Sequence, residues 1–141
     1  MPDPLNPTPV PAANPGPGPS TSTGLPSNVA AALACIPLIG GLVFYILEKN
    51  DRFVRFYAMQ SIIFGGIWFL FNLLSWVLRG IFWSIPVAGP IFGGLWFFAA
   101  ALIHLGLLVI MVIAMVKAFS GVLWDIPWVG PMARKQIGEA A

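Results

Sequence analysis

Three long stretches without a charged side chain dominate the pattern of hydrophobic and polar positions along the chain. They cover residues 29–47, 57–78 and 91–116, which are nineteen, twenty-two and twenty-six residues long. A helix rises about 1.5 Å per residue, so each stretch reaches roughly 28–39 Å and can cross a hydrocarbon core of about 30 Å. The pattern therefore predicts an all-α integral membrane protein with three transmembrane helices.

A short sequence repeat lies beside these stretches. Residues 83–90 and 124–131 agree at five of eight positions, and residues 36–40 are a shorter third copy. Proline stops a helix, glycine permits a bend, and tryptophan prefers the headgroup zone. We expect the long copies to form interfacial elbows at opposite membrane faces, with residues 80–90 either interfacial or re-entrant, and Pro37 to kink the first span.

The first 28 residues have a different composition from the rest of the chain. They hold nine of the fourteen prolines, and Asp3 is their only charged residue. Such a segment has too little apolar surface to offset the entropy of ordering it. We expect a disordered Pro-rich tail over 1–28, serving as a spacer or as a ligand of proline-recognition modules. A three-helix membrane domain over 29–137 and a C-terminal end over 138–141 follow.

The overall composition supports a membrane protein. Hydrophobic residues make up 58% of the chain and charged residues 9%, against about 45–50% and 25% in soluble domains. The surplus of two positive charges provides no basic face for nucleic acid, so we expect no nucleic-acid partner. The single cysteine excludes a disulfide framework.

Lysine and arginine are distributed unevenly around the expected spans. Six of the seven lie in the connection between the first two spans or beyond the third span, and only Arg79 lies on the side of the tail. Positive charge concentrates on the cytoplasmic side of membrane proteins. We therefore expect a multi-pass protein of the cell membrane with its N-terminus outside and its C-terminus in the cytoplasm.

The connection over residues 48–57 carries the first candidate site. Glu48 and Arg52 are four residues apart, as are Asp51 and Arg55, a spacing that favours ion pairs along a helix. The hypothesis is a docking site for anionic lipid or an acidic partner, and the alternative is an anchor that only fixes the topology. The expected contact residues are Lys49, Arg52, Phe53, Arg55, Phe56 and Lys117.

His104 lies in the middle of the third expected span. An ionisable group at that depth is a functional candidate. It could relay a proton or bind haem or a metal, or it could be a neutral imidazole bonded to Asn72, Ser75 or a backbone carbonyl. Asn72 and Ser75 share one helical stripe with Arg79, which marks an inner face of the bundle. His104, Asn72 and Ser75 form the candidate intramembrane polar site.

Other patterns that carry chemistry are missing from the sequence. His104 is the only histidine and Cys35 the only cysteine, so we expect no metal site built by one chain and no cofactor. The spans contain no Ser/His/Asp set, no paired carboxylates and no phosphate-cradling glycine loop. We therefore expect no catalytic residues and no enzymatic activity.

Two motifs resemble those of a family of small bacterial and archaeal membrane proteins. The first is the run EKNDRFVRFYAMQS at 48–61, and the second, looser one includes Lys117, Gly121, Pro127 and Gln136. The resemblance covers residues 29–137, and Tyr57 stands where the family usually has histidine. It implies a small helical membrane domain without an established function. Because the family is bacterial and archaeal, the resemblance implies a prokaryotic cytoplasmic membrane for this chain. It also implies a relation to the Tic-twenty-like component of chloroplast protein import.

The expected function follows from these features. We expect a non-enzymatic interaction or accessory subunit that lies in the bilayer and associates with itself or with another membrane protein. The alternative is an oligomeric channel or a translocon-like transport component. A three-helix bundle has little room for a pore, so a conduit would need several copies or a partner.

Overall fold

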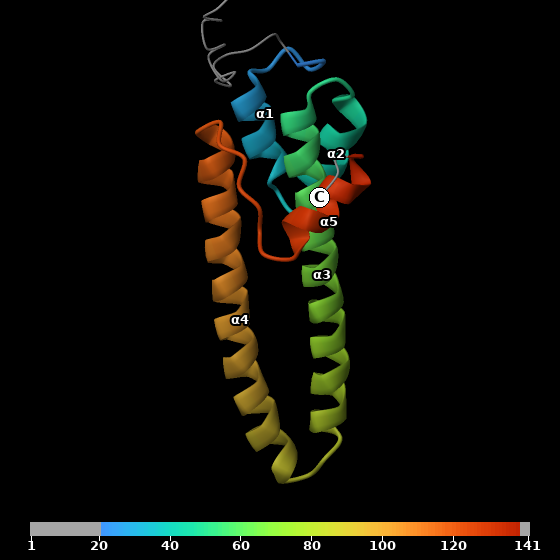
Figure 1. Cartoon of the computed structure of the whole chain (residues 1–141). Coiled ribbons are helices and arrows are strands. Elements are labelled where there is room, and N and C mark those ends of the chain that lie inside the picture. The colour runs from blue at the N-terminus through green and yellow to red at the C-terminus, as the bar shows by residue number, and fades with distance from the viewer. Residues whose placement is uncertain (1–20, 139–141) are drawn as a thin grey trace, which may run out of the picture.

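The computed structural model describes residues 21–138, and every regular element in that range is a helix. The expected all-α class is confirmed for this part of the chain. The order is α1 (Ser27–Ala34), α2 (Ile39–Leu47), α3 (Arg52–Trp83), α4 (Ala88–Phe119) and α5 (Val129–Gln136). Figure 1 shows α3 and α4 as a long hairpin, with α1, α2 and α5 gathered at its open end.

Helices α3 and α4 are the two elements that can cross a membrane. Each has 32 residues and is therefore about 48 Å long. Only Gly89, Ala114 and Ala118 of α4 are buried, so most of its leucine, isoleucine and phenylalanine side chains face outward. A water-soluble protein rarely exposes so large an apolar surface, whereas a lipid-facing helix requires it. The expected spans 57–78 and 91–116 lie inside these helices.

The expected first span, 29–47, is not one helix in the structure. It is divided into α1, of eight residues, and α2, of nine, each only about 12–14 Å long. The chain reverses direction between them, because the backbone N of Ser22, before α1, lies 2.7 Å from Oε2 of Glu48, after α2. Pro37 therefore separates two helices instead of kinking a single span.

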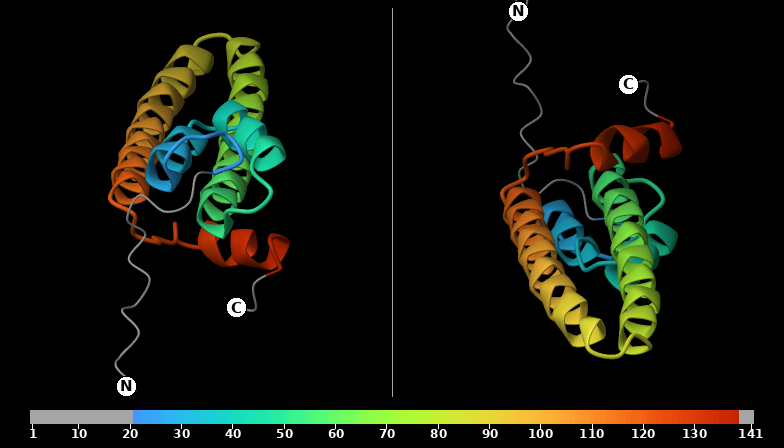
Figure 2. Two further views of the ribbon diagram at one scale, coloured as in Figure 1. Left: turned by 90° about the horizontal axis from the view of Figure 1, so that it is seen from above. Right: turned by 90° about the horizontal axis from the view of Figure 1, so that it is seen from below.

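Helix α1 lies between α3 and α4 (Figure 2) and contacts α2, α3 and α4. Ala30, Ala31 and Ala34 of α1 are fully buried, because alanine lets neighbouring backbones approach closely. Helix α2 packs on the outer side of α3, where Gly41 faces the carbonyl oxygen of Ala58 and has no space for a Cβ. The short helices thus fill the open end of the hairpin.

The repeat found in the sequence is a repeated turn that starts a helix. Leu38, Val87 and Trp128 follow the three prolines and have φ angles of 61°, 68° and 64°. The backbone N of the next residue bonds to the proline oxygen at 2.8, 2.8 and 2.9 Å, respectively. These are γ-turns of the rare positive-φ type, and α2, α4 and α5 each begin directly after one.

The expected elbow over 80–90 is shorter in the structure, where it is the copy of this turn over 83–90. Helix α3 continues to Trp83 and α4 starts at Ala88, so only residues 84–87 form the connection. The copy over 124–131 lies before α5, at the other end of the hairpin (Figure 1). The two long copies therefore lie at opposite ends of the molecule, as the sequence predicts.

The expected Pro-rich tail lies mostly outside the described residues, which exclude 1–20 and 139–141. Residues 21–28 were assigned to the tail by composition, but in the structure they belong to the fold. Ser27 begins α1, and the backbone N and hydroxyl of Ser22 both donate to Glu48. A buried carboxylate thus fixes a segment that has little apolar surface of its own.

Candidate functional site

The intramembrane candidate residues meet between α3 and α4. His104 Nδ1 lies 2.7 Å from the carbonyl oxygen of Ala100, and Nε2 lies 3.2 Å from Oδ1 of Asn72. Asn72 Nδ2 donates to the carbonyl oxygen of Trp68 at 2.8 Å, which turns its own oxygen toward the imidazole. Trp68 and Phe71 contact the ring at 6.0 and 5.4 Å between centroids. Each ring nitrogen of His104 therefore lies within hydrogen-bond distance of an oxygen, one on α4 and one on α3.

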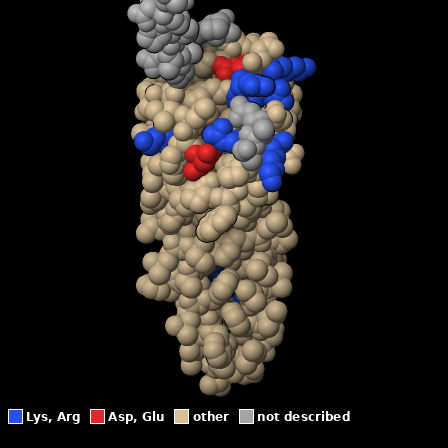
Figure 3. Space-filling view, viewed as in Figure 1, with Lys and Arg blue, Asp and Glu red and all other residues tan. Residues whose placement is uncertain are grey.

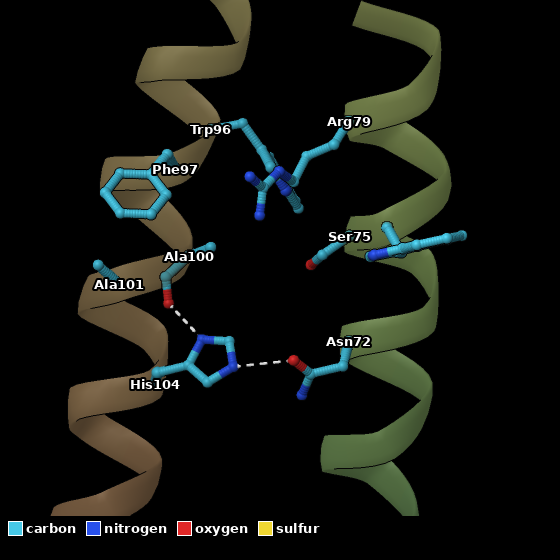
Figure 4. A pocket seen from close by; sticks show the side chains of 9 residues that line it. Asn72, Ser75, Arg79, Trp96, Phe97, Ala100, Ala101 and His104 are labelled. Atoms are coloured by element: carbon cyan, nitrogen blue, oxygen red, sulfur yellow. Dashed lines mark hydrogen bonds between the residues drawn. The ribbon is translucent and has the colours of Figure 1, made fainter. Parts of the chain in front are cut away.

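A pocket of about 290 Å³ begins at this histidine and extends toward the hairpin turn. Figure 4 shows Ser75 and Arg79 pointing into it from α3, and Trp96 entering from α4. Phe97, Ala100 and Ala101 supply an apolar wall. Ser75 lines the pocket but makes no hydrogen bond to His104, so the structure brings Asn72 to the imidazole and leaves the serine hydroxyl facing the pocket.

The basic connection forms a second, more open pocket of about 310 Å³. Lys49, Asn50, Arg52, Arg55 and Ile137 line it. Arg55 is partly committed to the fold, because its guanidinium donates to Lys49 O and Tyr45 Oη at 3.3 Å and lies over the Tyr45 ring. On the face shown in Figure 3, charged side chains gather over the same end of the molecule, and its lower half is almost entirely uncharged.

The other expected contact residues lie elsewhere. Phe56 is 1% exposed and packs beneath the guanidinium of Arg134, 4.8 Å from the ring centroid. Phe53 packs edge-on against Tyr57 and is partly buried. Lys117 lies in the last turn of α4 and does not line the basic pocket. Phe56 therefore contributes to the core in this structure, and three of the six residues share one pocket.

The expected helical ion pairs over 48–55 are wrong. Asp51 is the N-cap of α3, and its side chain accepts hydrogen bonds from Phe53 N and Val54 N, which stabilises the helix start. Glu48 is fully buried and accepts hydrogen bonds from the backbone N of Asn50 and Asp51 at 3.1 Å. Both carboxylates are thus used by backbone donors, and the nearby arginines are not paired with them.

Glu48 closes the loop between the start of α1 and the end of α2. Burial by itself raises the pKa of its carboxyl, but the hydrogen bonds from Asn50, Asp51 and Ser22 outweigh burial and hold the pKa below its ordinary value of 4.5. A depressed folded-state pKa stabilises the fold at pH values above the ordinary pKa. That contribution is lost as the pH falls through the folded-state value.

We expect Glu48→Gln to remove this pH dependence. In detergent, the thermal unfolding midpoint of the wild type should fall as the pH drops below about 4.5, because protonation costs the carboxylate its charge-assisted hydrogen bonds. The variant should start from a lower midpoint at neutral pH and fall less steeply over the same acid range. Parallel curves for the two proteins would show that Glu48 does not carry the effect.

Sequence reasoning missed two sets of residues. Trp96 lines the intramembrane pocket, and its position eight residues before His104 on the same helical stripe was the available signal. The second set ties the segment before α5 to α3. Tyr57 Oη donates to Val122 O at 2.5 Å and accepts from Trp124 N at 3.1 Å. Among the described residues, no three His, Cys, Asp or Glu side chains gather where a metal ion could bind.

Comparisons with known proteins identify relatives over most of the chain. A sequence model of the magnetosome magnetite crystal formation protein family matches residues 21–133. A UPF0132 membrane protein of Methanocaldococcus jannaschii is 34% identical over 114 residues, covering 79% of this chain and 89% of the relative. A UPF0132 membrane protein of Archaeoglobus fulgidus is 34% identical over 113 residues, covering 79% and 95%. No solved structure matches the chain.

Proposed function

The chain belongs to the magnetosome magnetite crystal formation protein family, and on that premise we propose that it is a non-enzymatic membrane protein whose hairpin presents a basic docking surface. The family description concerns magnetite crystals, whereas the archaeal relatives are described only as membrane proteins. The relatives' descriptions give a membrane location, and α3 and α4 are long and apolar enough to cross a bilayer. The proposal therefore rests on that location and on the basic pocket, and the relation to the Tic-twenty-like component stays a prediction from the motif.

The observation that carries the proposal is that the cations of the basic pocket form no ion pair with a carboxylate of the described residues. Lys49, Arg52 and Arg55 line it together, while the neighbouring acids Glu48 and Asp51 are turned toward backbone N–H groups. Clustered lysine and arginine at a membrane end attract anionic headgroups or acidic protein segments. This favours a docking site for anionic lipid or an acidic membrane partner over an anchor that only fixes the topology.

A two-span topology fits this surface best. The six cations other than Arg79 lie at the open end of the hairpin, on α3, α4, α5 and the 48–51 connection. The positive-inside rule then places that end in the cytoplasm. The pair α1–α2 re-enters the inner half of the bilayer and returns, so the N-terminal side of the described chain is cytoplasmic together with residue 138. This proposal replaces the expected three spans with an external N-terminus.

We expect the basic pocket to control binding to anionic bilayers. The double variant Lys49→Gln/Arg52→Gln should bind phosphatidylglycerol-rich nanodiscs about thirtyfold more weakly, because each cation near such a surface contributes about 1 kcal/mol. These two side chains are exposed and leave the Arg55–Tyr45 contact intact. Binding of the detergent-purified protein can be followed by microscale thermophoresis.

The matched control for this pair is Lys117→Gln/Lys135→Gln. It removes the same two charges from the same end of the molecule, but neither residue lines the pocket. A smaller loss of binding is expected, because isolated surface charges contribute less than a cluster. Equal losses in the two double variants would mean that the total charge, and not the pocket, attracts the bilayer.

An oligomeric channel is the second candidate function, and the pocket around His104 is the observation that favours it. Polar side chains inside a membrane often mark ion pathways. The pocket lies between α3 and α4 of one chain and does not cross the hairpin, so several copies would be needed. Proteoliposomes carrying an internal pH dye would test this function, and we expect no proton flux from the wild type. A flux that disappears in His104→Asn would favour the channel.

A further inference from the structure

The pocket between α3 and α4 presents hydrogen-bond donors that have no partner in the described part of the chain. Ser75 is 8% exposed, and neither its Oγ nor Nε1 of Trp96 has a hydrogen-bond partner, although both atoms are buried. Ser84 and Ser120 each bond to the carbonyl oxygen four residues earlier in their own helix. The hydroxyl of Ser75 is not used in that way and faces the pocket, as Figure 4 shows.

Arg79 adds a charge that this hairpin does not neutralise. Its side chain lines the same pocket and forms no ion pair with any residue in the range 21–138. The sequence has no aspartate or glutamate between Asp51 and Asp125, so α3 and α4 contain no carboxylate that could reach it. A guanidinium in or near a membrane is stabilised by a counter-ion, and a parallel second copy would carry its acids at the opposite end.

The amide and carbonyl oxygens near the pocket lie against His104. Oδ1 of Asn72 and the carbonyl oxygen of Ala100 both face the ring nitrogens of His104. The other polar groups of the lining are the guanidinium of Arg79, the hydroxyl of Ser75 and the indole N–H groups of Trp76 and Trp96, and all of them can donate. A pocket with several donors, a positive charge and no carboxylate in its lining is complementary to an oxyanion.

We propose that this pocket binds the phosphate group of a phospholipid. The planar guanidinium of Arg79 matches two phosphate oxygens at once, while Ser75 and Trp96 donate to the others. Phe97, Ala100 and Ala101 form the apolar wall against which the glycerol backbone and acyl chains pack.

The depth of the pocket agrees with a lipid headgroup. Arg79 lies 24 residues after Arg55 on α3, about 36 Å along the helix axis, so it lies near the face of the bilayer opposite the basic pocket. Trp76 and Trp83 are 77% and 75% exposed beside it, as expected of side chains at the headgroup level. In the two-span orientation proposed above, the bound phosphate is therefore that of an outer-leaflet lipid.

The test counts phosphatidylglycerol bound to the detergent-purified protein by native mass spectrometry. The background protein, in which all further variants are made, carries Lys49→Gln/Arg52→Gln. These two changes remove the basic pocket, so the result does not depend on the function proposed above. We expect one lipid per chain to remain. Ser75→Ala and Trp96→Phe, which keep the helix and the ring, should each weaken its binding about tenfold. The controls Ser84→Ala and Trp128→Phe, outside the pocket, should bind as the background does.

Three further measurements distinguish phosphate recognition from its alternatives. Diacylglycerol, which lacks the phosphate, should not bind. The Arg79→Lys variant should bind phosphatidylglycerol more weakly than the background protein, because lysine cannot contact two phosphate oxygens at once. Inorganic phosphate should not displace the lipid at equal concentration. The proposal is overturned if Ser75→Ala and Trp96→Phe bind as the background does, if diacylglycerol binds equally well, or if inorganic phosphate competes and thereby proves to be the ligand.

Discussion

Gly89→Ala should destabilise the protein by about 2–3 kcal/mol, a cost typical of overpacking at a site that cannot relax. A Cβ at residue 89 would lie 2.0 Å from the carbonyl oxygen of Phe82. That oxygen belongs to the backbone of α3 and accepts a hydrogen bond from Ile85 N, so it cannot move without opening the turn. The measurement is the free energy of unfolding in mixed micelles, followed by circular dichroism.

Two controls separate this contact from general effects of replacing glycine. Gly106→Ala lies in the same helix with nothing within 4 Å of the added Cβ, and should be neutral or stabilising because alanine favours helices. Val87→Gly should not destabilise, because glycine adopts a positive φ without the cost that a β-branched residue bears. A Gly89→Ala protein as stable as the wild type would show that the tight turn over 84–88 does not form.

The long helices could be predicted from the sequence because hydropathy and length are enough to define them. The expected spans 57–78 and 91–116 fall inside α3 and α4. Their ends could not be placed, because the uncharged run continues through residues 79–90 apart from Arg79, and lack of charge does not distinguish a helix from a turn. The Asp51 cap and the γ-turn at Val87 set the true boundaries.

The segment 29–47 shows where hydropathy is insufficient. Its nineteen uncharged residues satisfy a length criterion, but the backbone turns at Leu38 with φ 61°. The signal was present in the repeat, because residues 36–40 share the pattern Ile-Pro-x-x-Gly with the two copies that were expected to be elbows. The third copy forms the same turn, and Gly40 is equally constrained, since a Cβ there would lie 2.4 Å from Leu33 O.

The candidate site was predictable where helical spacing defined a stripe. Asn72, Ser75 and Arg79 repeat at intervals of three and four, and His104 lies opposite them. Spacing alone could not show that Asn72 turns its oxygen to the imidazole while Ser75 keeps a free hydroxyl. Those differences depend on the register between α3 and α4, which the turn at 84–87 sets. Trp96 was missed because tryptophan was interpreted only as a residue that prefers the headgroup zone.

Cysteine labelling should place residue 22 on the cytoplasmic side. In a Cys35→Ala background, single cysteines replace Ser22, Asn50 and Ser84, which are all exposed. On intact cells an impermeant thiol reagent should label position 84 strongly and leave positions 22 and 50 unlabelled, because Ser22 lies beside Glu48 while 84 lies at the hairpin turn. Permeabilised cells should label all three, which shows that each cysteine can react.

Position 22 alone distinguishes two spans from three, because both topologies place residue 50 inside and residue 84 outside. External labelling at 22 would require 29–47 to cross the bilayer as one helix. The γ-turn at Leu38 would then have to straighten, and the two hydrogen bonds from Ser22 to Glu48 would break. Glu48 would lose two of its four donors while remaining buried, a large cost for a carboxylate. The packing of Glu48 therefore predicts that a cysteine at position 22 is not labelled on intact cells and is labelled after permeabilisation.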